Sequence, residues 1–181
     1  MKRSLILLSS AALGVAALYA GAGAQVLKNH DSNAPVNFTA DRIEVQDRAD
    51  RVLVSGNVVV TQAGMTLNAA RMTVAYRNGT GDNGVEVDRI DASGNVVVTK
   101  GNETARGNAA IYDLNSRLIT MLGNVTLTQG TNRLTGGRVV IDLNSGRSTV
   151  DGRASGGEAP GVSSNSGGRV SGTFTVPQRK N

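Results

Sequence analysis

Few side chains in this sequence could carry out catalysis. The chain contains one histidine, His30, and no cysteine, so thiol nucleophiles and the usual His/Cys zinc sites are excluded. His30 lies among polar residues near the start of the chain, where we expect a solvated linker residue. Any catalytic chemistry would therefore have to depend on carboxylates.

The aspartates are the remaining candidates, and most fall on turns or on outward positions of strands: Asp41, Asp88, Asp91, Asp113, Asp142 and Asp151. Parallel β-helix enzymes that cleave polysaccharides do place carboxylates on an outer sheet face. Here no pair has the spacing of a general acid and base, and the five aromatic residues are too few to stack against a sugar chain. Calcium-binding Gly/Asp nonapeptide repeats are also absent. We therefore expect no enzyme activity, no metal and no cofactor.

The N-terminus has the three parts of a secretory signal peptide. Lys2 and Arg3 precede an apolar run over 5–18, and an Ala-x-Ala site at 22–24 predicts cleavage before Gln25. The apolar run is shorter than the roughly 20 residues that span a bilayer. We predict a signal peptide over 1–24 and an exported chain; a retained membrane anchor is the alternative.

Composition favours an all-β protein. The sequence has 23 glycines and only 3 prolines, Val, Thr and Asn are frequent, and no segment has helical periodicity. The formal net charge is +5 and falls to +3 without Lys2 and Arg3. This mild excess suits anionic lipid headgroups but is too small and dispersed for nucleic acid.

The chain repeats itself. The segment 55–62 (SGNVVVTQ) returns at 93–100 and at 122–129, with a weaker copy at 150–153. A second element at 38–45 returns at 67–74, 105–112 and 134–141. Both elements give a unit of 29 residues, interrupted once by nine extra residues. The polar, Gly-rich segment 77–84 is the expected loop insertion.

Alternation within each unit predicts strands with one buried face. Val52, Val54, Val58 and Val60 share one parity, and the later copies contribute Val96, Val98, Val125 and Leu127. By the same parity the repeated glycines at 56, 94, 123 and 152 would point inward, where a missing side chain permits a bend.

The second element breaks this alternation. Leu67 and Met72 are separated by an odd step of five, as are the apolar pairs at 38/43 and 134/139. Such a step requires a kink or bulge. We therefore predict a corner at the small residues 40, 69, 107 and 136, where each strand leaves one sheet and joins another. The predicted fold is an all-β twisted jelly roll, or solenoid-like stack of antiparallel strands, built from ~29-residue repeats.

The remaining segments complete the domain organisation. We predict a flexible N-terminal segment over 25–34, the β-jelly roll over 35–153 and a Gly/Ser-rich loop over 154–168. A C-terminal strand over 169–177 and a basic tail over 178–181 follow. The residues alone leave two interpretations of the inward face: an ordinary core, or two sheets far enough apart to admit acyl chains.

Several of these segments resemble the OstA-like domain family. The resemblance rests on 55–62, on 36–41 (VNFTAD) and on 67–70 (LNAA), and extends over about 35–143. The segment 169–177 (RVSGTFTVP) is similar to the final strand of family members.

The resemblance implies a periplasmic lipopolysaccharide carrier with an open, apolar interior that holds the acyl chains of lipid A. It also implies head-to-tail homo-oligomers that bridge the inner and outer membranes through an LptC-like inner-membrane protein and an LptD-like outer-membrane protein. By position, Val36 and Phe38 match the ligand-facing first strand, and Tyr112 and Leu114 match a later inward pair. With the inward repeat positions, the expected ligand-binding residues are Val36, Phe38, Val52, Val54, Val58, Val60, Val96, Val98, Tyr112, Leu114, Val125 and Leu127.

Unpaired strand edges at the two ends of such a stack suit end-to-end joining. The first strand (35–45) and the last (169–176) are the candidates. Two alternatives stay open: a structural β-solenoid that polymerises without a ligand, and a membrane-anchored, LptC-like member of the same family.

Overall fold

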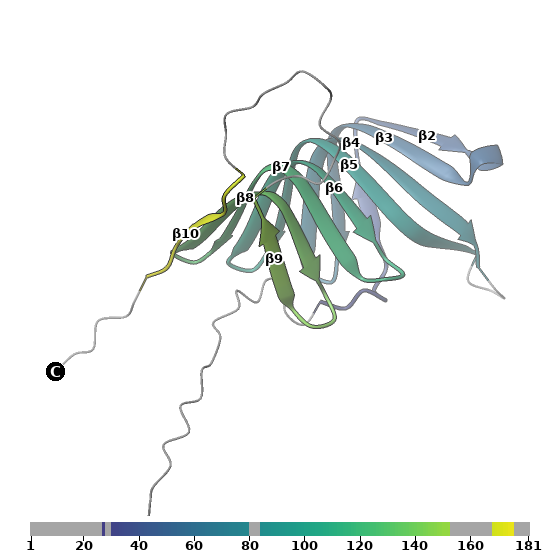
Figure 1. Ribbon diagram of the computed structural model, residues 1–181. Coiled ribbons are helices and arrows are strands. Elements are labelled where there is room, and N and C mark those ends of the chain that lie inside the picture. The colour runs from purple at the N-terminus through teal and green to yellow at the C-terminus, as the bar shows by residue number, and fades with distance from the viewer. Residues whose placement is uncertain (1–26, 28–29, 80–83, 153–167, 176–181) are drawn as a thin grey trace, which may run out of the picture.

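The computed structural model describes residues 27, 30–79, 84–152 and 168–175. The predicted signal peptide and basic tail, and all of the predicted loop except Gly168, lie outside these residues. The described chain forms one antiparallel sheet (Figure 1). Its strands are β1 (Asn37–Thr39), β2 (Arg42–Gln46), β3 (Arg51–Gln62), β4 (Met65–Asn78), β5 (Val85–Lys100), β6 (Glu103–Asp113), β7 (Leu118–Gln129), β8 (Asn132–Asp142), β9 (Arg147–Asp151) and β10 (Ser171–Thr173). The predicted all-β, antiparallel fold is confirmed.

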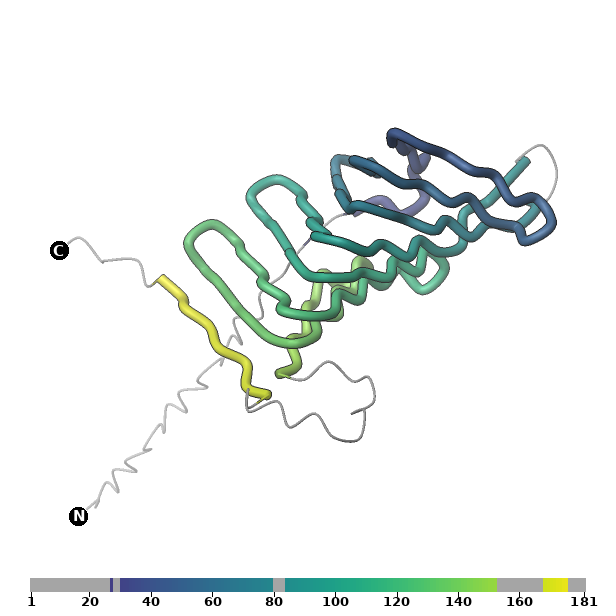
Figure 2. The backbone as a smooth tube through the Cα atoms, turned by 90° about the horizontal axis from the view of Figure 1, so that it is seen from above, coloured from purple at the N-terminus to yellow at the C-terminus, as the bar shows by residue number. Residues whose placement is uncertain are grey.

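Successive hairpins follow one another along the molecule, from β2–β3 at one end to β8 and β10 at the other (Figure 2). At the first end, β1 and β2 both pair with β3. At the second end, β9 and β10 both pair with β8. A short 3₁₀ turn, η1 (Asp47–Ala49), joins β2 to β3. Within the described ranges, no helix is long and apolar enough to cross a membrane.

Each of β3, β5 and β7 bends at a two-residue bulge made of Gly and Asn. In β3, Ser55 lies opposite Arg71 and Val58 opposite Ala69, so two residues face one. Both bulge residues have positive φ, +78° for Gly56 and +46° for Asn57, a conformation that Gly and Asn tolerate best. The same bulge returns at 94–95 and 123–124. The repeated sequence element therefore encodes a repeated bend.

The row of bulges, here called the fold line, divides the sheet into two half-sheets that face each other. Half-sheet A contains residues 37–39, 58–62, 65–69, 96–100, 103–107, 125–129, 132–136 and 171–173. Half-sheet B contains residues 42–46, 51–55, 71–78, 85–93, 109–113, 118–122, 138–142 and 147–151. The strands run through the bend, so the predicted corner folds one sheet rather than passing strands between two sheets. The hairpin ends opposite the fold line are called the rim.

Two expectations are wrong, one about the glycines at the bend and one about the nine-residue insertion. The repeated glycines do not point inward: a Cβ on Gly94 would lie 2.8 Å from the Cβ of Ala70, and both residues are exposed. At a bulge, two residues of one strand lie opposite one residue of its partner, so the alternation of inward and outward side chains is interrupted there. The nine-residue insertion is also only partly a loop, because Arg77 and Asn78 belong to β4 and Asn78 pairs with Val85 of β5.

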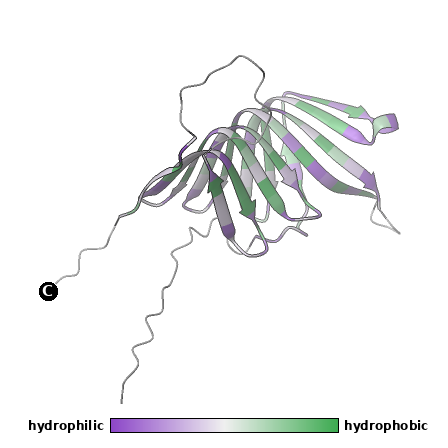
Figure 3. Ribbon diagram, in the orientation of Figure 1, coloured by the Kyte–Doolittle hydropathy of each residue, from purple (hydrophilic) through white to green (hydrophobic). Residues whose placement is uncertain are grey.

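The inward faces of both half-sheets contribute to one apolar cluster. Hydrophobic and hydrophilic residues alternate along the strands (Figure 3). Half-sheet A supplies Val58 and Val98, and half-sheet B supplies Ile90 and Ile119, each exposed by 1% or less. The core thus lies between the two halves of the folded sheet.

Candidate functional site

All twelve residues expected to face the interior lie in or against this cluster. Eight are buried: Val54, Val58, Val60, Val96, Val98, Tyr112, Val125 and Leu127. The other four are partly buried and pack against them: Val36, Phe38, Val52 and Leu114. The structure therefore brings together residues that the sequence separates by up to 91 positions, from Val36 to Leu127.

The cluster also contains inward residues outside the expected ligand-binding set. They are Met65, Leu67, Met72, Val74, Ile90, Ile119, Met121, Val139 and Ile141. The two inward faces are packed against each other, and Ile90, Val96 and Val98 have no exposed surface. Because protein interiors are close-packed, acyl chains could enter between the half-sheets only if these separated.

The rim has a polar inward edge that the sequence did not reveal. Gln62, at the end of β3, continues the inward parity of Val58 and Val60 and is 2% exposed. Its Oε1 accepts a hydrogen bond from the hydroxyl of Tyr112, 2.7 Å away in half-sheet B. Its Nε2 donates to the carbonyl oxygens of Ser32 (3.0 Å) and Ala34 (2.9 Å). Gln62 therefore connects both half-sheets to the N-terminal segment.

His30 belongs to the same cluster, and the expectation that it is a solvated linker residue is wrong. It is 9% exposed, its Nε2 lies 3.1 Å from Oε1 of Gln62, and its ring meets that of Tyr112 edge to face. Burial lowers the pKa of His30, as does the nearby Lys100. Only the fold brings residues 30, 62 and 112 together, so no local sequence signal could have indicated the contact.

Leu27 and Glu103 extend these contacts along the rim. The side chain of Leu27 is 1% exposed and belongs to the apolar cluster. Its backbone N–H donates to Oε2 of Glu103, while Oε1 of Glu103 accepts from Nε2 of Gln129 at 2.8 Å. Where a flexible segment was expected over 25–34, Leu27 and residues 30–34 make specific contacts.

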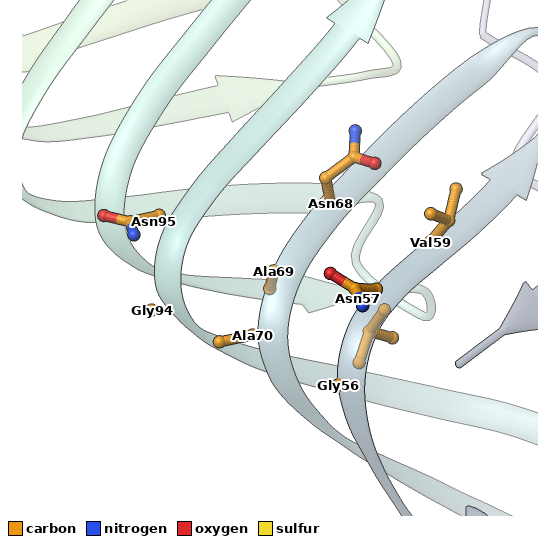
Figure 4. Close-up of a pocket in the computed structure, with 9 residues that line it drawn as sticks. Gly56, Asn57, Val59, Asn68, Ala69, Ala70, Gly94 and Asn95 are labelled. Carbon is orange, nitrogen blue, oxygen red and sulfur yellow. The ribbon is translucent and has the colours of Figure 1, made fainter. Parts of the chain in front are cut away.

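Two hollows lie at different places on the folded sheet, one at the rim and one at the fold line. One, of about 680 Å³, opens at the rim and is lined by Ser32, Asn33, Ala34, Pro35, Val36, Gln62, Arg77, Val85, Glu86, Val87, Leu114 and Asn115. The other, of about 500 Å³, lies at the fold line, where Asn57 and Asn95 flank the bends of their strands (Figure 4). Asn68 also lines the second hollow. The walls of both hollows combine polar and apolar groups, so neither is by itself the predominantly apolar pocket of a hydrophobic ligand. The rim hollow adjoins the apolar cluster through Val36, Val87 and Leu114.

The charged side chains are mostly on the outside of the folded sheet. Arg89 pairs with Asp91 at 2.6 Å along β5, and both side chains are more than 40% exposed. Hydrogen bonds from Ser116 lower the pKa of Asp113 at a hairpin turn. Among the described residues, no group of three His, Cys, Asp or Glu side chains could hold a metal ion. The arrangement thus favours an apolar interior with a polar rim.

Comparison with known families assigns this architecture. A family model described as the LptA/(LptD N-terminal domain) LPS transport protein matches residues 37–147. The chain belongs to this family. The expected resemblance to the OstA-like family is thereby confirmed, and within it the chain is LptA-like. The matched residues include both half-sheets from β1 to the start of β9.

One protein sequence and one solved structure are similar to this LptA-like chain. An uncharacterized protein of Rhizobium meliloti (strain 1021) is 31% identical over 118 residues, which cover 64% of this chain and 61% of that protein. The chain therefore spans less than two thirds of that relative. The crystal structure of LptH, the LptA homologous periplasmic component of the lipopolysaccharide transport device from Pseudomonas aeruginosa, aligns with a TM-score of 0.66. The two chains are 21% identical, and the alignment covers 81% of this chain and 99% of the LptH chain. The likeness therefore shows a shared fold.

Proposed function

We propose that this protein carries lipopolysaccharide through the periplasm and shields the acyl chains of lipid A between its two half-sheets. The observation that carries the proposal is the single apolar cluster to which both half-sheets contribute, in a chain that belongs to a lipopolysaccharide transport family. No catalytic step is needed for this role. Any energy for movement would come from a partner.

The polar rim supports this choice of ligand. Lipid A combines several acyl chains with a charged, hydrogen-bonding headgroup, so its site needs an apolar interior beside polar groups. Gln62 and Glu103 lie at the rim, next to the apolar positions Val60 and Ala105 on the same strands. A lipid whose acyl chains enter between the half-sheets would keep its headgroup at this rim.

Photo-crosslinking in cells tests the proposal. A photoreactive amino acid at Phe38 or Tyr112 is expected to form adducts with lipopolysaccharide, because both side chains contact the apolar cluster. The matched outward positions are Asn57 and Asn95, which are exposed at the fold line. Equal adducts from outward positions, or none from inward ones, would contradict the carrier function and favour a structural solenoid without a ligand.

We further propose that copies join end to end and bridge LptC-like and LptD-like partners. β1 and β2 each pair on one side only, as do β9 and β10 at the other end, among the strands that the structure describes. Such edges can add a strand from a neighbouring molecule. On β2, Ile43 and Val45 are 49% and 59% exposed, although they lie opposite the inward residues Val54 and Val52. A neighbour at this end would cover them.

A charge placed at this end tests the joining. Val45→Asp is expected to shift the molecular mass measured by light scattering toward that of the single chain. Val85→Asp is the matched control, because Val85 is 58% exposed but lies on β5, which is paired on both sides. If both substitutions, or neither, reduce the mass, the β2 end is not the joining surface.

Cleavage of the signal peptide is part of the proposal and is tested separately. N-terminal sequencing of the exported protein is expected to begin at Gln25. An intact Met1 would instead support the membrane-anchored, LptC-like alternative.

A further inference from the structure

The N-terminal segment crosses the opening through which a ligand would have to pass. Residues 30–36 alternate between more and less buried positions, yet they precede β1 and form no ladder with any strand that the structure describes. Together with Leu27 they are called the strap. The strap contacts half-sheet A through Gln62 and half-sheet B through Tyr112, and it also contacts Arg117 in the turn between β6 and β7. It therefore spans the rim.

The contacts of the strap resemble those expected of a bound amphiphile. Leu27 places an apolar side chain in the core cluster, as an acyl chain would. The backbone carbonyls of Ser32 and Ala34 occupy both hydrogens of the Gln62 amide, and the N–H of Leu27 occupies Oε2 of Glu103. The polar groups at the rim that would face a lipid headgroup are thus occupied by this chain's own backbone.

The same contacts are suited to release. A segment held by side chains, outside the sheet ladder, opens at a lower free-energy cost than a paired strand. Gln62 alone makes three of the polar contacts, and Arg117 adds an exposed one to Asn33 at 3.3 Å. Removal of the strap would expose the rim of both half-sheets without breaking a β-ladder.

We propose that the strap is a displaceable plug, which occupies the acyl-chain entrance of the empty protein and leaves when lipopolysaccharide binds. The inference rests on the proposed function, because it concerns the same interior. It predicts competition: the apparent affinity for the lipid is reduced by the fraction of molecules in which the strap is closed.

Thiol accessibility measures the position of the strap directly. The sequence contains no cysteine, so Ser32→Cys introduces a unique thiol in place of a hydroxyl whose oxygen is buried. Ser148→Cys is the matched control, because the hydroxyl oxygen of Ser148 is also buried but lies on β9. With purified lipopolysaccharide, the maleimide reaction of Ser32→Cys is expected to accelerate about tenfold or more, while that of Ser148→Cys stays unchanged.

A second variant releases the strap without lipid. Gln62→Met keeps the length of the side chain but loses the amide that holds Ser32 and Ala34. It is expected to increase the labelling of Ser32→Cys and to tighten binding of fluorescein-labelled lipopolysaccharide about tenfold, measured by anisotropy. Gln46→Met is the control, because Gln46 bonds to Glu44 and Arg51 on the exposed side of the β2–β3 hairpin.

The outcomes separate the two proposals. If lipopolysaccharide binds while Ser32→Cys remains protected and Gln62→Met binds no more tightly, the strap is a permanent part of the fold and only this inference fails. If lipopolysaccharide binds to neither the wild-type chain nor Gln62→Met, both the carrier function and the strap inference are overturned.

Discussion

The hydroxyl of Tyr112 lies 2.7 Å from Oε1 of Gln62 and donates a hydrogen bond that joins the two half-sheets at the rim. Tyr112 is 1% exposed and Gln62 is 2% exposed, so water cannot readily replace the bond. The half-sheets are continuous at the fold line, and here they are joined again at the opposite side. This bond therefore keeps the two half-sheets together at the rim, so that the interior is closed on this side as well as at the fold line.

Loss of this hydroxyl is expected to weaken the closed state. Among the described residues, Tyr112→Phe leaves Oε1 of Gln62 with His30 as its remaining side-chain partner. It should lower the free energy of unfolding by about 1 kcal/mol. Urea denaturation monitored by circular dichroism measures the change. Tyr76→Phe is the control, since the hydroxyl of Tyr76 donates to Asp47 in an exposed contact. Equal losses of unfolding free energy in the two variants would show that the buried hydrogen bond at the rim stabilises the fold no more than an exposed one.

The sequence predicted the strands and the inward face because both depend on local patterns. Val96 and Val98 alternate with outward residues, and burial of one face of a strand requires this period of two. The 29-residue repeat also located the bend. It did not give the orientation of Gly94, because the two-residue bulge alters the count on one strand alone.

The rim could not be predicted in the same way. A glutamine at the end of a strand and a histidine near the chain start are both typical of solvated positions. Gln62 and His30 are buried because Tyr112, 50 residues beyond Gln62, approaches them from the opposite half-sheet. Their burial depends on long-range folding, which periodicity does not encode.

A charge in the interior is expected to be far more costly than one outside. Val96→Asp would bury a carboxylate where the side chain has no exposed surface, and should lower the free energy of unfolding by more than about 3 kcal/mol. Val97→Asp places the same charge on the adjacent, outward position of β5 and should change stability by less than about 1 kcal/mol. Thermal unfolding of both variants measures the difference. Comparable losses would contradict the assignment of the inward face.

The bulge glycines should not tolerate a side chain. Gly94→Ala combines a φ of +83° with a Cβ only 2.8 Å from the Cβ of Ala70, so we expect a loss of about 1–3 kcal/mol in unfolding free energy. Gly64→Ala has a similar φ of +76° but no atom within 4 Å of the new Cβ. It therefore isolates the backbone cost, which is about 1 kcal/mol.

A second substitution at Ala70 tests whether the close contact with this residue causes the loss in Gly94→Ala. Ala70→Gly removes the atom that the new Cβ would meet, so the Gly94→Ala/Ala70→Gly double variant should recover part of the stability lost by Gly94→Ala. Urea denaturation of the single and double variants gives the coupling between the two sites. Purely additive effects would show that the close approach does not limit the bend.

Acidification is expected to loosen the strap through His30. Its pKa lies below the ordinary value of 6.5, first because burial disfavours the charged ring and further because of Lys100, although the hydrogen bond with Gln62 and the charge of Asp31 act in the opposite direction. The closed state therefore binds the neutral ring better than the open one does. Its stability is constant well above pH 6.5 and falls as the pH drops through 6.5 toward the lower pKa of the closed state.

Proton NMR can follow this titration without ambiguity, because His30 is the single histidine of the sequence. In the folded protein the midpoint of the imidazole signal should lie below 6.5, and in concentrated urea it should return to about 6.5. Gln62→Met removes the hydrogen bond that favours the charged ring but also opens the strap. If the strap opens, the midpoint moves up toward 6.5; if the strap stays closed, it moves further down. A folded-state midpoint at or above 6.5 would mean that His30 is solvated and that the strap does not cover the rim.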